Sequence, residues 1–237
     1  MQNKEIAELN KQAVGLAAED ILKLAEQIFP GKIIFANSLG AEDQVITHFI
    51  ANNKLNIPIF TLDTGRQFYE SYTLIARTER KYDLKIDVFF PESDEVEEMV
   101  NKHGINLFYE SVEMRKLCCE VRKTRPLQRA LKGNEAWICG LRKEQAVTRT
   151  DIDIFEWDEN NGLIKINPLA DWTEEKLWQF VKENDVTYNL LHDKGFRSIG
   201  CAPCTRAAAS DADVRSGRWW WENPDTKECG LHNKPAG

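Results

Sequence analysis

The sequence predicts an α/β protein in which a parallel sheet is flanked by helices. Short, almost uniformly apolar runs alternate along the chain with segments of helical length. Such runs are typical of strands buried on both faces of a parallel sheet, and their alternation with helices implies βαβ units with right-handed crossovers. The 237 residues suffice for one domain of this kind. We therefore expect a single nucleotide-binding domain over residues 1–210 and a mobile C-terminal tail over residues 211–237.

The first half of the chain carries three of these strand–helix units. Residues 4–29 have apolar side chains at helical spacing and stop before Pro30-Gly31, which indicates one or two helices. The expected strands are Lys32–Asn37, Ile57–Leu62 and Ile86–Phe90. The expected helices are 45–52, 68–82 and an acidic helix through Val100 that Ser93 caps.

The second half is less regular. Residues 107–131 predict helical segments broken near Pro126, and Ala136–Cys139 predicts a further strand. Residues 150–157 and 163–167 flank an Asn-Gly pair, which is a strong signal for a β-hairpin. Thr173 is the expected cap of a helix that runs to about Asn184.

Composition excludes several classes of function. The net charge of −7 and the pI of about 5.3 argue against a general nucleic-acid or anionic-membrane binder. No stretch approaches the roughly 20 apolar residues of a membrane span, and the N-terminus has no apolar signal-peptide core. We expect a cytoplasmic protein, in which six cysteines point to metal or redox chemistry rather than to disulfides.

Two loops follow strands on what should be one rim of the sheet, where ligands of parallel sheets bind. The first, Ser38–Asp43, places a Ser and a Gly at the start of a helix, an arrangement that can cradle an anion; the second is Asp63–Arg66. An ordinary βα loop is the alternative. The first loop lacks the Lys of a phosphate-binding P-loop, so cations from elsewhere must balance an anion; the candidates are Lys123, Arg142, Arg149, Arg215 and Arg218.

Four cysteines form a candidate metal site: Cys118, Cys119, Cys201 and Cys204. A tetrathiolate zinc site usually has two Cys-x₂₋₄-Cys hooks, and the adjacent pair Cys118-Cys119 departs from that spacing. An iron–sulfur cluster offers several irons to adjacent thiolates, so the spacing favours a cluster modestly and leaves zinc open.

The two remaining cysteines differ in their surroundings. Cys139 lies in an apolar strand and is expected to be a small buried hydrophobe. Cys229 lies in a polar tail with His232 three residues on, so it is either incidental or a nucleophile that cations activate. The other three histidines, His48, His103 and His192, show no ligand pairing and receive no predicted role.

Taken in order, these motifs resemble one family. They are Ser38–Asp43, Leu62–Gly65, Cys118-Cys119 with Arg122-Lys123, Gly140–Arg142, Cys201–Cys204 and Glu228–His232. The chain is similar to the assimilatory sulfonucleotide reductases over roughly residues 32–232, and to their iron–sulfur branch that acts on adenylyl sulfate (APS). The resemblance implies an adenine-nucleotide α-hydrolase-like (PP-loop related) fold, a [4Fe–4S] cluster held by the four cysteines, and thioredoxin as a transient partner.

The resemblance also implies roles for single residues. Cys229 would be the nucleophile that attacks the sulfur of APS, expels AMP and carries an S-sulfocysteine until a thioredoxin thiol releases sulfite. The substrate-binding residues would be Ser38, Leu39, Gly40, Asp43, Leu62, Asp63, Lys123, Arg142, Arg149, Arg215, Arg218 and His232.

Other functions remain open at this point. A reductase of 3′-phosphoadenylyl sulfate (PAPS), or one that accepts both substrates, would share most of the motifs, although members that use PAPS alone typically lack the cluster cysteines. An ATP-pyrophosphatase would carry a Ser-Gly-Gly-x-Asp-Ser loop, which Ser38–Asp43 is not. A zinc-stapled nucleic-acid-binding module conflicts with the acidic composition. Homo-oligomer formation is left open.

Overall fold

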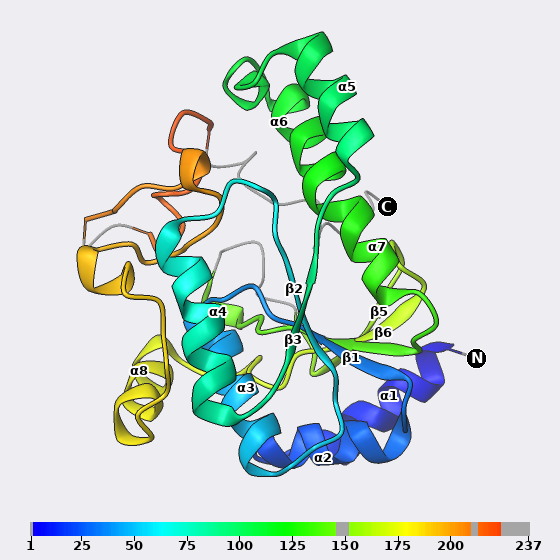
Figure 1. Cartoon of the computed structure of the whole chain (residues 1–237). Helices are drawn as coiled ribbons and strands as arrows, with labels where there is room; N and C mark the ends of the chain where they lie inside the picture. The colour runs from blue at the N-terminus through cyan, green and yellow to red at the C-terminus, as the bar shows by residue number, and fades with distance from the viewer. Residues whose placement is uncertain (1, 146–151, 210–212, 224–237) are drawn as a thin grey trace.

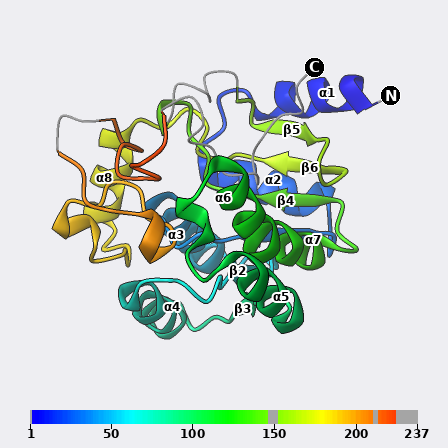
Figure 2. The ribbon, with the colours of Figure 1, turned by 90° about the horizontal axis from the view of Figure 1, so that it is seen from above.

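A six-stranded sheet organises the computed structural model, which describes residues 2–145, 152–209 and 213–223. Its strands lie in the order β3-β2-β1-β4-β6-β5, and every pairing is parallel except that of β5 with β6. Viewed from above, β5 lies at one edge of the sheet beside α1, and β3 lies at the other (Figure 2). The strands are β1 (Ile33–Ala36), β2 (Ile59–Leu62), β3 (Ile86–Phe89), β4 (Ala136–Ile138), β5 (Phe155–Asp158) and β6 (Leu163–Ile166).

Each predicted strand is present, although β5 ends one residue beyond its predicted segment, and the predicted fold class is confirmed. The predicted hairpin is β5 and β6, in which Phe155 pairs with Ile166 in antiparallel register. β5 begins at Phe155 rather than at residue 150, and residues 146–151 lie outside the described part of the chain.

One face of the sheet packs against four helices: α1 (Gln2–Ala13), α2 (Ala18–Ile28), α3 (Ala41–Asn52) and α8 (Glu174–Glu183). α3 begins four residues before the predicted Val45, because Gly40 ends the loop in extended backbone and two acidic residues follow in the first turn, where the helix dipole favours them. Thr173 caps α8 as predicted, since its hydroxyl accepts a hydrogen bond of 3.1 Å from the Lys176 amide.

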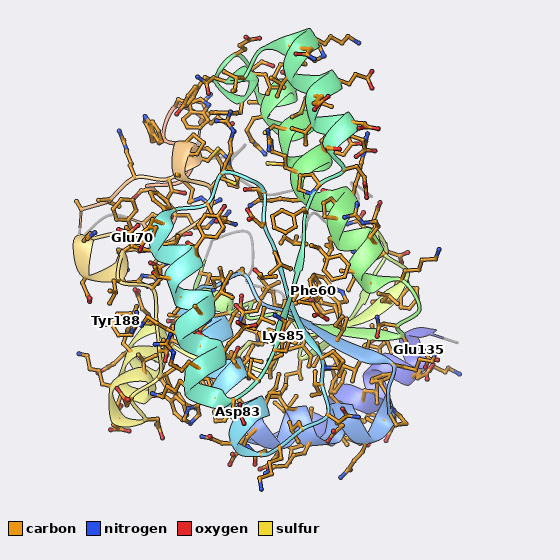
Figure 3. All side chains as sticks on the ribbon, viewed as in Figure 1. Phe60, Glu70, Asp83, Lys85, Glu135 and Tyr188 are labelled. Carbon is orange, nitrogen blue, oxygen red and sulfur yellow. The ribbon has the colours of Figure 1, made fainter. Side chains whose placement is uncertain are left out.

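The other helices are α4 (Tyr69–Tyr82), α5 (Ser93–His103), α6 (Val112–Cys119) and α7 (Arg125–Leu131). α5, α6 and α7 stand together above the strands (Figure 1), and α7 covers Phe60, which is labelled at the centre of Figure 3. The prediction that Ser93 caps α5 is wrong: Glu92 is the N-cap, and Ser93 is the first helical residue, whose hydroxyl donates to Asp94.

The break predicted near Pro126 is a π-helical turn, Glu120–Thr124, that joins α6 to α7 directly after the tandem cysteines. Such turns are frequent at functional sites. No helix in the described ranges is long and apolar enough to cross a bilayer.

The sheet also fixes where a ligand can bind. From β1 the chain continues to β2 and β3 on one side, whereas β4 lies on the other side of β1. A crevice opens at such a switch point, beyond the carboxyl ends of the strands. Here the loop after β1, Ser38–Asp43, and the loop after β4, which starts at Gly140, face each other across it.

Candidate active site

A cavity of about 210 Å³ occupies the switch point. The loop after β1, the ends of β2 and β4, and two later segments, 197–200 and 214–218, form its walls. Of the predicted substrate-binding residues, the structure places seven on this wall: Ser38, Gly40, Asp43, Leu62, Lys123, Arg215 and Arg218. Residues far apart in the sequence therefore meet in one cavity, at the place where small-molecule sites occur in α/β sheets.

The loop after β1 is held in shape by its own hydrogen bonds. Asp43 accepts from both the amide and the hydroxyl of Ser38, at 2.6 and 2.5 Å. Leu39 adopts a left-handed backbone with φ of 65°, and its amide donates to Asn37 Oδ1 at 2.7 Å. This closed loop leaves Ser38 and Gly40 facing the cavity.

The carboxyl of Asp43 has an unusually high pKa. Burial raises its pKa to about 7, and the neighbouring Glu42 carboxylate adds to the shift while the Ser38 hydrogen bonds oppose it. Gly140 packs closely against this carboxyl, since a Cβ there would lie 2.2 Å from Asp43 Oδ1. A carboxyl that is protonated near neutral pH reduces repulsion toward an anion bound in the cavity.

Cations line the opposite wall. Arg218 is buried, its Nη1 donates to the Ile199 carbonyl at 3.3 Å, and its Nε has no hydrogen-bond partner among the described residues. Lys123 and Arg215 reach the same wall. A buried guanidinium with an unused donor suits a phosphate or sulfonate oxygen, which accepts such forked hydrogen bonds.

Arg142 takes a different place from the one its sequence position suggests. Its buried guanidinium contacts Glu42 at 2.9 Å and donates to the Trp172 carbonyl, and it is absent from the described cavity wall. Through this contact with Glu42, Arg142 stabilises the first turn of α3. Leu39 and Asp63 also lie off this wall, and Asp63 accepts from the Gly65 amide and the Tyr72 hydroxyl. Substrate contact by these three residues stays a prediction.

The four candidate ligand cysteines come together in a second, much smaller hollow of about 20 Å³. Cys118 and Cys119 end α6, and Cys201 and Cys204 flank a 3₁₀ turn, Ala202–Cys204. Lys123 lines both this hollow and the larger cavity. In the described ranges, no group of three or more His, Cys, Asp or Glu side chains is arranged to hold a single metal ion.

The surroundings of the sulfurs fit an anionic sulfur-ligated group. Three further cations, Arg66, Arg115 and Arg122, line the hollow with Lys123. Arg122 Nε is buried and has no hydrogen-bond partner in the part of the chain described. Four thiolates around a cationic metal–sulfide core carry a net negative charge, which complements the positive charge of these side chains.

Two of the thiols, those of Cys118 and Cys204, have raised pKa values. Burial raises the pKa of Cys204 to about 12 and also raises the pKa of Cys118, although Arg122 opposes the shift at Cys118. Metal coordination deprotonates such thiols. Thr64 completes the setting, because its hydroxyl lies 3.2 Å from Cys201 Sγ and its carbonyl accepts from Arg122 at 2.7 Å.

Sequence analysis missed several residues of the larger cavity, among them Gln67, Ser71, Gln145, His192 and Arg197. His192, given no predicted role, lies on the cavity wall, and its Nε2 is buried without a hydrogen-bond partner among the described residues. Burial lowers the pKa of His192, so the ring is neutral at pH 7. No spacing in the sequence marks this histidine, because only the fold brings the 3₁₀ turn His192–Lys194 to the switch point.

Three predicted site residues cannot be placed. Arg149, Cys229 and His232 lie outside the described residues. The neighbouring segment 213–223 packs against the body of the protein, with Trp219 in a hydrophobic cluster that includes Cys204. The division of the chain at residue 210 stays a prediction.

The position of the cavity defines the class of protein: an α/β protein with a cavity at the switch point, beyond the carboxyl ends of its parallel strands, where ligands of such sheets bind. Residues 32–207 match the family described as the phosphoadenosine phosphosulfate reductase domain, and the chain belongs to that family. It is thereby an oxidoreductase that acts on a sulfur group, and the resemblance found in the sequence is confirmed.

Relatives of known name agree. The chain is 54% identical over 202 residues to the adenosine 5′-phosphosulfate reductase of Allochromatium vinosum, covering 85% of this chain and 79% of the relative. It is 47% identical over 228 residues to the enzyme of the same name from Sinorhizobium fredii, covering 96% and 90%.

Solved structures place the fold. The phosphoadenylyl-sulfate reductase of Candida auris, in a phosphate complex, matches with a TM-score of 0.74 and 32% identity over 84% of this chain and 95% of that one. The FMN adenylyltransferase of Candida glabrata matches with a TM-score of 0.58 at 15% identity, over 87% of this chain and 70% of that one, and shares the fold alone.

Proposed function

We propose that this chain reduces adenylyl sulfate to sulfite and AMP, with a thioredoxin dithiol as the electron donor. The observation that carries the proposal is the meeting of four cysteines in one hollow, joined through Lys123 to a cation-lined nucleotide cavity. The names of the relatives support it. We place the reaction in the cytoplasm, where thiol donors are kept reduced.

The first step is attack by the Cys229 thiolate on the sulfonate sulfur of adenylyl sulfate. The bond from this sulfur to the bridging phosphate oxygen breaks, AMP leaves with the electron pair, and Cys229 carries an S-sulfonate. Lys123, Arg215 and Arg218 reduce the repulsion between thiolate and phosphosulfate. In the second step a thioredoxin thiolate attacks Cys229 Sγ and expels sulfite, and the second thioredoxin thiol then displaces Cys229 as a thiolate, leaving oxidised thioredoxin.

The four cysteines Cys118, Cys119, Cys201 and Cys204 would hold a [4Fe–4S] cluster. When bound, the cluster would supply a fixed negative charge beside Lys123 and would take no part in the bond exchange at Cys229. Lys123 then faces both the sulfur ligands and the substrate anion, so its ammonium is the natural link between them.

Reduction of PAPS is the second candidate, favoured by the structural match to the Candida auris enzyme. The four cysteines favour adenylyl sulfate, because in the resembling family they accompany that substrate. The two proposals differ in one measurable property, the rate of sulfite release from each nucleotide.

The test is anaerobic purification with an iron count and a visible spectrum, followed by sulfite release from adenylyl sulfate and from PAPS with reduced thioredoxin. We expect a coloured iron protein that releases sulfite faster from adenylyl sulfate. The variant Cys229→Ser should keep the visible absorption and nucleotide binding and release no sulfite. A colourless zinc protein without sulfite release would overturn the proposal, and faster turnover of PAPS would favour the second candidate.

A further inference from the structure

Trp219 lies between the two hollows. Its side chain is 1% exposed, and its amide donates to the Cys204 carbonyl at 3.1 Å, so the residue is attached to the cysteine hairpin. The backbone there is left-handed, with φ of 40°, which a non-glycine residue adopts only when its surroundings enforce it. The indole Nε1 is buried and has no hydrogen-bond partner in the described ranges. Packing on the ring faces, rather than a hydrogen bond, therefore decides where the indole sits.

Three guanidinium groups contact this one indole ring. The Cζ atoms of Arg115, Arg218 and Arg215 lie 4.7, 4.6 and 5.6 Å from its centroid. All three distances are within the range of a cation–π interaction. Arg115 lines the cysteine hollow, whereas Arg218 and Arg215 line the nucleotide cavity. The ring is thus shared by residues of both sites.

On the side of the cysteines, Arg115 is fixed in place. It is fully buried, and its Nε and Nη2 each donate to Glu222 at 2.9 Å in a forked ion pair. Such a pair has a defined planar geometry. Because Arg115 cannot turn away without leaving Glu222 buried and unpaired, it holds the indole from one direction.

On the side of the nucleotide, Arg218 has little other support. It packs against Gly200, where a Cβ would come within 2.3 Å of Nη2, and it makes one long hydrogen bond to the Ile199 carbonyl. Its Nε has no partner in the described ranges. The orientation of the guanidinium plane therefore depends on contact with the indole face on one side and with the backbone of Ile199 and Gly200 on the other.

We propose that Trp219 is a positioning residue: its indole holds Arg218 and Arg215 toward the substrate anion and, through Arg115, ties their placement to the four-cysteine site. The inference rests on the proposed function in that the anion is the phosphosulfate of adenylyl sulfate. Trp219 touches no reacting atom and acts through the arginines. The expected loss of about tenfold in affinity corresponds to 1.4 kcal/mol, which a desolvated cation–π contact can supply.

The test compares Trp219→Leu with Trp219→Phe. Leu keeps apolar bulk and removes the π face, whereas Phe keeps a smaller π face. We expect Trp219→Leu to raise the KM for adenylyl sulfate and the Kd for AMP about tenfold, and Trp219→Phe to keep both within about threefold of the wild type. Iron content and the visible spectrum are measured on each variant, so loss of the cysteine site is separated from loss of nucleotide affinity.

Trp221 provides a matched control. It belongs to the same hydrophobic cluster and packs on Phe108, Tyr109 and Trp220, and no arginine among the described residues makes a cation–π contact with its ring. Trp221→Leu should lower the thermal midpoint, as Trp219→Leu does, and leave the Kd for AMP within about threefold.

A double variant tests whether Trp219 acts through Arg218. If it does, Trp219→Leu combined with Arg218→Lys should weaken AMP binding by less than the product of the two single changes. Multiplying effects, equal losses in the Leu and Phe variants, or an unchanged Kd in Trp219→Leu would each overturn the inference. Should Trp219→Leu not fold, Trp219→Met replaces it in the same comparison. A wild type that binds AMP but releases no sulfite from adenylyl sulfate would overturn the proposed function alone.

Discussion

The nucleotide cavity and the four-cysteine hollow lie side by side but are built in different ways. The cavity rests on the ends of parallel strands, whose positions the sheet fixes, and short loops supply its polar groups. The hollow rests on the end of α6, a π-helical turn and a short 3₁₀ turn, none of which belongs to the sheet. The first site is therefore preorganised by the backbone, whereas the second depends on side-chain charge and on what the sulfurs bind.

This difference predicts how each site fails. Loss of one group at the cavity should weaken binding by a measurable factor and leave the fold intact. Loss of one ligand in the hollow should remove the bound group altogether, because the remaining three thiols cannot complete its coordination.

The largest effect is expected from Cys204→Ser, which removes one of the four predicted ligands. Iron content and sulfite release should be lost together, since the remaining three thiols cannot complete the site. Inductively coupled plasma analysis and the visible spectrum measure the first, and a sulfite assay measures the second. Cys139→Ser is the matched thiol change, and its iron content should be unchanged because Cys139 lies apart, with Sγ donating to Asn167 at 3.1 Å. An active Cys204→Ser protein without iron would break the comparison.

The next effect is expected at the ion pair behind the hollow. Arg115 and Glu222 have side-chain exposures of 0% and 3%, so Arg115→Met leaves a buried carboxylate without its partner. Removing one member of such a pair costs about 3–5 kcal/mol of unfolding free energy. Urea denaturation of the iron-loaded protein measures it.

The control for that prediction is a pair of the same kind at the surface. Arg125 contacts Glu95 at 2.9 Å, with side-chain exposures of 41% and 35%. Arg125→Met should cost less than about 1 kcal/mol, because solvent screens the pair. Equal losses in the two variants would show that burial does not set the strength of the Arg115 pair.

Much of the fold and part of the site follow from the sequence alone. The apolar runs predict the strands, and the strand ends predict that Ser38–Asp43 and Asp63–Arg66 share a rim, because parallel strands end together. The cysteines were predictable for a different reason: a tandem pair is chemically odd enough to require a partner.

Side-chain direction did not follow from the sequence. Arg142 lies next to the rim, but its guanidinium contacts Glu42. A sequence position does not tell whether an arginine contacts a bound anion or a nearby carboxylate. The shared position of Arg115, Trp219 and Arg218 depends on two segments, α6 and the chain around residues 218–219, that meet only in the folded chain. His192 was missed for the same reason.

A smaller effect is expected at Asp43, on the side of the cavity. The pKa of Asp43 is raised from 3.8 to about 7, so between these pH values the folded protein keeps a proton that the unfolded chain has released. The contribution of Asp43 to the free energy of unfolding therefore falls as the pH rises from about 4 to about 7. Above pH 7 the ionised carboxyl also repels the substrate anion. The KM for adenylyl sulfate should rise about tenfold from pH 6 to pH 8.

Asp43→Asn should flatten both profiles, because the amide does not titrate. Urea denaturation across the pH range measures stability, and steady-state kinetics at the same pH values measure KM. A variant whose KM rises with pH as steeply as that of the wild type would locate the titrating group elsewhere.

The smallest effect is expected at Thr64, which lies in the loop after β2 and close to Cys201. Its buried hydroxyl lies 3.2 Å from Cys201 Sγ and accepts from the Arg66 amide at 3.3 Å. Thr64→Val keeps the shape and removes the hydroxyl, which should cost about 0.5–1.5 kcal/mol of unfolding free energy. Hydrogen bonds to ligand sulfurs also tune an iron–sulfur group, so the visible spectrum should shift and iron should be released faster to a chelator.

Thr78→Val separates that local effect from a general loss of stability. Thr78 is equally buried, and its hydroxyl donates to Gln44 Oε1 at 2.9 Å, away from the cysteines. It should lose a similar amount of unfolding free energy while its visible spectrum and rate of iron release stay at wild-type values. If both variants released iron at the same rate, the Thr64 hydroxyl would act through protein stability alone. The surrounding charge would then hold the sulfur ligands without a hydrogen bond from Thr64.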